Sequence, residues 1–155
     1  MQTEFSWLAR DKGLSLEVAC CEHVVCSDPL LLERILRNLI SNAIRYTEHG
    51  EVALACKQVA GGLQLEVRDT GIGIASDNLS HIFEEYYQVG NQQRNRNEGL
   101  GLGLAIVKRL EQLLDYRMKL DSTLGVGSCF TFVVPLVDTS VVASPDDMIN
   151  PIRSL

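Results

Sequence analysis

The sequence predicts a two-layer α/β (α+β) sandwich, in which a mixed, mostly antiparallel sheet of about five strands is covered on one face by about three helices. Five short segments alternate apolar and polar residues, which is the period of a half-buried strand. Three other segments carry helix start signals or apolar residues at helical spacing. The later strands come in adjacent pairs joined by glycine-rich turns, which favours antiparallel pairing on one layer and helices on the other.

Length and composition limit the possible classes of protein. The chain has 155 residues, 46% of them apolar, and a formal net charge of -6. These values predict one globular domain with its own core and exclude extensive disorder. No apolar run reaches about 18 residues, so neither a transmembrane helix nor membrane contact by this chain is expected. The acidic balance argues against nucleic-acid binding. Five cysteines without a C-x-x-C pair predict reduced thiols and a cytoplasmic location.

The first half of the chain predicts one strand and one long helix. Residues 5–10 contain several apolar side chains but are too short to be an independent element, and residues 14–20 alternate as a strand. The helix begins at Pro29, with Ser27 or Asp28 as its N-cap, and Gly50 ends it in the C′ position.

The second half alternates strands with two shorter helices. Strands are expected at 52–58, 63–69, 117–121 and 128–134, and helices at 76–84 and 101–114. The polar run between the two helices predicts a mobile loop.

The long helix also carries a polar face. Asn38 and Asn42 are four residues apart and Arg45 follows by three, so these side chains adjoin, with Tyr46 at the edge. Asparagine is a poor helix former, and the pair costs about 1 kcal/mol relative to alanine. Exposed polar filler is one explanation. The other is an amide oxygen facing a hard cation such as Mg²⁺, which binds through few protein ligands and phosphates.

Asp69 is the second anomaly, because it occupies the inward phase of its strand after Leu63, Leu65 and Val67. A carboxylate in that phase is costly unless it is hydrogen-bonded. A turn-forming aspartate at a strand end is the structural explanation. The functional one is an acceptor that holds an exocyclic amine such as that of adenine.

The third anomaly is the run Gly99-Leu100-Gly101-Leu102-Gly103-Leu104 at a helix start. Glycines there let backbone N–H groups cradle a phosphate, aided by the helix dipole. The run is neither a Walker loop nor a convincing dinucleotide fingerprint. Arg94 and Arg96 precede it and are candidates for further phosphate contacts.

These motifs together resemble the ATP-binding catalytic domain of bacterial sensor histidine kinases, within the GHKL superfamily. The resemblance covers about residues 5–135 and includes five boxes in the family order. They are the N box at 38–47, the first glycine box at 69–74, the F box at 82–88, the second glycine box at 98–107, and the closing turn and strand at 125–130.

The resemblance implies roles for the matching residues. Asn42 would ligate Mg²⁺ on the ATP phosphates, and Asn38 and Arg45 would complete the catalytic set beside it. Asp69 would accept the adenine amine. The remaining implied nucleotide contacts are Tyr46, Gly71, Gly73, Ile74, Phe83, Arg94, Arg96, Gly99, Gly101, Leu102, Gly103, Leu104 and Thr131. Phe83 would anchor an ATP lid at about 88–100, which the glycines would hinge.

The resemblance also implies a reaction and partners. Hydrolytic members of the superfamily carry a glutamate one turn before the metal asparagine, and Asn38 stands there instead, so hydrolysis should be slow. The γ-phosphate would go to a histidine on a separate dimerisation domain and then to an aspartate of a response-regulator receiver domain. Residues 1–12 would end a linker from that upstream domain, 13–136 would form the catalytic domain, and 137–155 a flexible tail or linker.

Two alternatives remain open at this point. One is a GHKL ATPase or anti-sigma-type serine kinase module, which steady ATP turnover or serine phosphorylation would reveal. The other is a catalytically silent signalling scaffold, against which the intact set of motif residues argues. Histidines 23, 49 and 81 lack the neighbours of the family's phosphoacceptor and favour structural roles.

Overall fold

The computed structural model describes residues 2–19, 22–89 and 101–137. Five strands form one sheet in the order β1-β2-β3-β5-β4. The strands are β1 (Ser15–Val18), β2 (Glu51–Val59), β3 (Gly62–Asp69), β4 (Lys119–Thr123) and β5 (Gly127–Val134). β1 pairs with β2 in parallel and the other neighbours are antiparallel. The sheet is therefore mixed and mostly antiparallel, as the sequence predicts.

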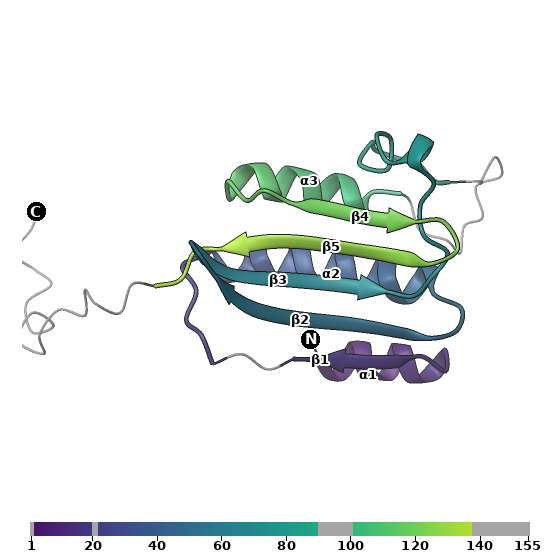
Figure 1. The fold of residues 1–155 in the computed structure, drawn as a ribbon, viewed down its shortest axis with the longest axis horizontal. Coiled ribbons are helices and arrows are strands. Elements are labelled where there is room, and N and C mark those ends of the chain that lie inside the picture. The colour runs from purple at the N-terminus through teal and green to yellow at the C-terminus, as the bar shows by residue number, and fades with distance from the viewer. Residues whose placement is uncertain (1, 20–21, 90–100, 138–155) are drawn as a thin grey trace, which may run out of the picture.

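Three α-helices accompany the sheet, namely α1 (Gln2–Asp11), α2 (Pro29–Tyr46) and α3 (Gly103–Leu113). α2 lies behind the central strands and α3 lies beside it, while α1 adjoins the β1 edge (Figure 1). Burial of apolar side chains between these layers stabilises the fold at about 25 cal/mol per Å². The largest fully buried side chains include Ile35 and Leu39 of α2 and Val67 and Phe132 of the sheet.

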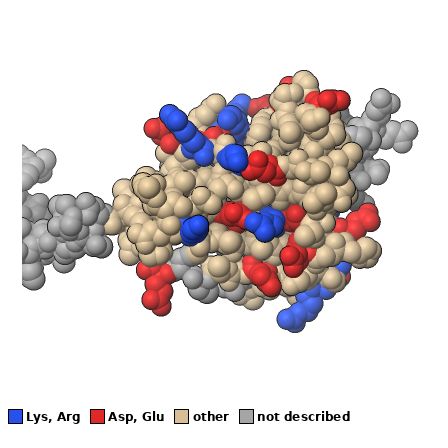
Figure 2. Space-filling model, viewed as in Figure 1, with Lys and Arg blue, Asp and Glu red and all other residues tan. Residues whose placement is uncertain are grey.

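The opposite face of the sheet is open and polar. Figure 2 views this face, on which acidic and basic side chains are interspersed. Glu66 pairs with Arg68, and Lys119 pairs with Asp121 at 3.0 Å. Neither sign of charge dominates, and pairs of this exposed kind contribute at most about 1 kcal/mol each.

α1 corrects the expectation that residues 5–10 are too short to be an element. The helix is ten residues long, and Phe5 and Ala9 are buried in the core. Helices this short are marginal alone and are stabilised by packing. Arg37 of α2 also donates to one carboxylate oxygen of Glu4 in α1 from both of its terminal guanidinium nitrogens, at 2.9 and 2.7 Å.

Two expected helix boundaries also differ. α2 ends at Tyr46 with Thr47 as its C-cap, so the expectation that Gly50 ends the helix is wrong. The buried Thr47 hydroxyl donates to the Ala43 carbonyl at 2.7 Å and closes the last turn. The helix expected from residue 76 is only a 3₁₀ turn at Ser76–Asn78, followed by further turns.

Among the described residues, one cysteine differs from expectation. Cys56 on β2 is disulfide-bonded, so the expectation of reduced thiols is wrong there. Cys26 and Cys129 are free. An odd number of cysteines means that they cannot all be paired in disulfides, but it does not exclude a single disulfide.

Candidate functional site

A cavity lies where the end of α2 meets the ends of β3 and β5. Its walls come from α2, the two strands, the loop after β3, the segment before residue 90 and the first turn of α3. The lining residues are Asn42, Ala43, Tyr46, Asp69, Ile72, Gly73, Ile74, Ile82, Tyr87, Gln88, Val89, Leu104, Ser128 and Phe130. Concave, mostly apolar pockets with a few polar groups are typical of small-molecule sites.

Asp69 is the only carboxylate among the described residues that line the cavity. It shares its phase with the buried Leu65 and Val67, as the alternation predicts. Burial raises the pKa of the Asp69 carboxyl, and hydrogen bonds from the backbone amides of Gly71 and Ser128 partly oppose that rise. No described Lys or Arg forms an ion pair with it, which leaves acceptor capacity directed at a ligand donor.

The loop after β3 is held rigidly against the sheet. Gly71 N–H donates to an Asp69 carboxylate oxygen at 2.9 Å, and Ile74 N–H donates to the Ser122 hydroxyl at 2.8 Å. Gly73 has φ +66, and a Cβ there would lie 2.0 Å from the Thr123 carbonyl oxygen. Glycine is therefore required at this position, where the backbone forms one wall of the cavity.

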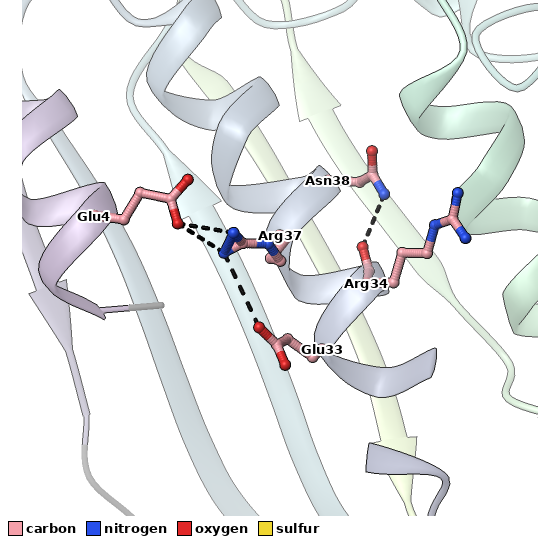
Figure 3. A network of polar contacts seen from close by, with 5 residues as sticks. All are labelled: Glu4, Glu33, Arg34, Arg37 and Asn38. Atoms are coloured by element: carbon pink, nitrogen blue, oxygen red, sulfur yellow. Dashed lines mark hydrogen bonds and ion pairs between the residues drawn. The ribbon is translucent and has the colours of Figure 1, made fainter. Parts of the chain in front are cut away.

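The polar face of α2 reaches the cavity only in part. Asn42 and Tyr46 line it, whereas Asn38 lies one turn earlier and its amide donates to the Arg34 carbonyl at 2.8 Å. Figure 3 shows Asn38 on the side of α2 nearer α3 and Arg37 on the other side, reaching Glu4 of α1. Arg45 is exposed and is not among the lining residues.

The N-terminus of α3 faces these asparagines. A Cβ on Gly103 would lie 3.1 Å from the Asn38 amide oxygen and 3.7 Å from the Asn42 amide atoms. Leu102 is the N-cap and supplies no side-chain hydrogen bond. The first N–H groups of α3 and the positive end of its dipole are thus placed beside the two amides, an arrangement suited to an anion.

The F-box segment is attached to α3 at several points. Lys108 Nζ lies 5.7 Å from the centre of the half-buried Phe83 ring, and Arg109 pairs with Glu85. Tyr86 N–H donates to the Gly101 carbonyl at 3.1 Å, which joins the two chain segments on either side of residues 90–100. Gly101 has φ +69, the left-handed region that glycine favours.

Some expected site residues are not brought to the cavity. Thr131 lies in the opposite phase of β5 from Ser128 and Phe130, with its hydroxyl 3.7 Å from the Cys129 sulfur on the open face. Phe83, Gly71, Gly101, Leu102 and Gly103 are also not among the lining residues. Arg94, Arg96 and Gly99 lie outside the described residues.

Several apolar residues that line the cavity were not identified from the sequence. Ile72, Ile82, Tyr87 and Phe130 line it but were not assigned a ligand contact. Phe130 was detectable, because it has the same strand phase as the core residues on β5. The others lie in loops and turns, where no periodicity reports which way a side chain points.

The donor set fits a hard cation held mainly by a ligand's phosphates. Asn42 offers an amide oxygen at the cavity wall, beside the α3 N-terminus. Among the described residues no group of three or more His, Cys, Asp or Glu is arranged to hold a metal. Mg²⁺ suits such a site because it keeps several waters and needs few protein ligands.

Comparison with known proteins yields one family. Residues 27–138 match the model described as "Histidine kinase-, DNA gyrase B-, and HSP90-like ATPase". The sensor histidine kinase RcsC of Escherichia coli K12 is 38% identical over 109 residues, which cover 70% of this chain and 12% of RcsC. The sensor histidine kinase AtsR of Burkholderia thailandensis is 38% identical over 149 residues, covering 92% of this chain and 25% of AtsR. The chain therefore spans a quarter or less of these relatives.

Solved structures agree with the fold. Full-length ShkA in complex with AMPPNP superposes with a TM-score of 0.75 and 33% identity, over 87% of this chain and 28% of that one. The mycobacterial sensor histidine kinase MprB gives 0.69 at 24% identity, over 87% and 94% of the two chains. The second likeness concerns the fold alone. In the part of the chain that the structure describes, no helix has the length and apolarity needed to cross a bilayer.

Proposed function

Because this chain belongs to the family of histidine kinase-, DNA gyrase B- and HSP90-like ATPases, we propose that it is the Mg²⁺-ATP-binding catalytic domain of a sensor histidine kinase. The observation that carries the proposal is the position of Asp69 at one side of a cavity whose other side reaches Asn42 and Leu104, at the start of α3. One concave site thus combines an amine acceptor with an anion-binding helix end.

The adenine base would lie against Asp69, with its exocyclic amine donating to the carboxylate. Ile72, Ile74 and Phe130 would enclose the base, and Tyr46 would pack at its edge. An ionised carboxylate accepts hydrogen bonds without donating any, so it favours a base that presents an amine there. The similarity to ShkA, whose structure is a complex with AMPPNP, supports nucleotide binding by this domain.

The phosphates would extend toward α2 and α3. Asn42 would hold Mg²⁺ together with the phosphate oxygens, and the first N–H groups of α3 would bind phosphate directly. The metal, when bound, would neutralise charge that develops on the transferring phosphoryl group. Asn38 would orient the same groups, and Arg45 would add positive charge nearby. Arg94, Arg96 and Gly99 are proposed as further contacts from outside the described residues.

The same site favours transfer over hydrolysis. The position one turn before Asn42 holds Asn38, and an amide cannot take a proton from water at neutral pH. Phosphoryl transfer relies chiefly on positioning and electrostatic stabilisation. The acceptor would be a histidine on a separate dimerisation domain of the full-length protein, and a receiver-domain aspartate would follow. The relatives are named sensor histidine kinases, which supports a histidine as the acceptor. We place the reaction in the cytoplasm.

Isothermal titration with AMPPNP and Mg²⁺ tests the binding step. We expect one nucleotide per chain, and no heat at millimolar nucleotide with a folded protein would refute the proposal. A second reaction, with ATP and a separately produced histidine-bearing domain, should give acid-labile phosphohistidine. Steady release of phosphate by the chain alone, or phosphoserine on a partner, would favour the ATPase or serine kinase alternatives instead.

A further inference from the structure

The Lys12 side chain joins the corner between α1 and β1 to the end of α2. Its ammonium donates to the carbonyl oxygens of Ile44 and Arg45, each at 2.7 Å, and of Thr47 at 2.9 Å. An ammonium has three donors and all three are used here. The ion also lies at the negative end of the α2 dipole, where a cation is stabilising.

These bonds complete the hydrogen bonding of the α2 terminus. The last four carbonyls of a helix have no partner within it. In α2 the Ala43 carbonyl accepts from the Thr47 hydroxyl, the next two accept from Lys12, and the Tyr46 carbonyl accepts from Ile72 N–H at 3.1 Å. Lys12 therefore binds the second and third of the four terminal carbonyls. The fourth, that of Tyr46, binds the loop after β3.

The turn that Lys12 holds forms one side of the cavity. Tyr46 lines the cavity, and its carbonyl binds the loop that contributes Ile72. The contact is close, because a Cβ on Gly71 would lie 2.3 Å from the Tyr46 carbonyl oxygen. A displacement of this turn must therefore displace the loop that follows Asp69.

Lys12 is itself held in place by the core. It follows α1, whose Ala9 is buried and whose Ala9 carbonyl accepts from the backbone amides of Lys12 at 3.1 Å and Leu14 at 2.8 Å. Gly13 takes φ +75, which turns the chain from helix to strand. The ammonium thus reaches α2 from an anchored corner of the fold.

We propose that Lys12 is a positioning residue for the nucleotide site, fixing the Tyr46–Thr47 turn and through it the loop against which the base rests. The inference deepens the proposed function and rests on it. It predicts that Lys12 affects the binding of the base, although it lies outside the cavity, and leaves the binding of phosphates by Asn42 and α3 unchanged.

The test compares Lys12→Met with wild type in two measurements. The dissociation constant for Mg²⁺-AMPPNP should rise about tenfold, while that for Mg²⁺-tripolyphosphate should change less than about twofold. Amide hydrogen exchange of the free protein should show lost protection at Ile72 but not in the core strands. Lys12→Arg should restore part of both effects, and Arg10→Met, which removes an exposed cation two positions earlier, is the matched control.

The outcomes separate the two proposals. Absence of nucleotide binding by the wild-type chain would overturn the proposed function and this inference with it. Normal nucleotide binding in wild type, with Lys12→Met equal to it in affinity and in Ile72 protection, would overturn the inference alone. An equal loss of nucleotide and tripolyphosphate affinity would also contradict it, because that result indicates general loss of structure.

Discussion

Under the proposed function, Asp69 favours nucleotide binding at the expense of stability. Its carboxylate is partly buried without a cationic partner among the described residues, and burial raises its pKa. For Asp69→Asn we expect a rise of at least about tenfold in the dissociation constant for Mg²⁺-AMPPNP, because the amide presents donors to the adenine amine. The free energy of unfolding at pH 7 should not fall, because the variant removes a charge that burial disfavours.

The pH dependence of this effect has a definite sign. A carboxyl whose pKa is raised in the folded state stabilises the fold below its unfolded pKa, and this contribution is lost as pH rises through the folded value. Denaturant titrations of wild type and Asp69→Asn, from about the ordinary value of 3.8 upward, should therefore show the variant gaining relative stability as pH rises. A relative gain as pH falls would contradict the environment described for Asp69.

Asn42 should contribute to binding only when a metal is present. It borders the apolar stripe of α2 and faces the cavity. Asn42→Ala is expected to remove most of the gain in ATP affinity that Mg²⁺ provides. The variant should fold normally, because alanine favours a helix over asparagine by a few tenths of a kcal/mol. Titrations with Mg²⁺ and with a chelator measure that gain.

A neighbouring serine offers the control. Ser41 is half-buried on the same helix but does not line the cavity, so Ser41→Ala should keep the full response to Mg²⁺. If Asn42→Ala also kept it, the metal-binding role of Asn42 would be refuted.

At the scale of elements, the two ends of α2 have different tasks. Asp28 caps the first end, accepting from the backbone amides of Leu30 at 2.9 Å and Leu31 at 3.0 Å. Asp28→Ala should lower the free energy of unfolding by about 1 kcal/mol. Nucleotide affinity should remain unchanged, because the site lies at the other end of the helix. Denaturant unfolding and titration of the same sample check both values, with Asp28→Asn as the variant that keeps the cap.

The elements show where sequence patterns suffice and where they fail. The alternation of Leu63, Leu65 and Val67 correctly predicted both β3 and the inward phase of Asp69. The end of α2 was placed too late, because Thr47 and Lys12 close the helix and Lys12 comes from more than 30 residues away. No local pattern contains such a contact. Applying the alternation to β5 would have placed Thr131 on the open face beside Cys129.

At the scale of the molecule, the sequence indicated the layer of helices and the sheet but not the cavity that forms where they meet. The cavity exists only where α2, β3, β5 and α3 meet, and its apolar residues come from segments far apart in the chain. Asn42 and Asp69 were recognisable singly because each departs from the ordinary preference of its element. Ile72 and Phe130 are ordinary apolar residues for their positions, so only the assembled structure assigns them to the cavity wall.

Since the cavity is walled by both layers, a bound nucleotide should stabilise the whole domain. A ligand at about 100 times its dissociation constant adds about 2.7 kcal/mol to the free energy of unfolding. For a domain of this size that corresponds to a rise of about 8 °C in the melting temperature, measured with Mg²⁺-AMPPNP by calorimetry. Asp69→Asn at the same nucleotide concentration should show at most about half of that rise, because an affinity at least tenfold weaker lowers the added free energy to about 1.4 kcal/mol or less. Equal rises in the two proteins would place the nucleotide elsewhere and would contradict the cavity as the binding site.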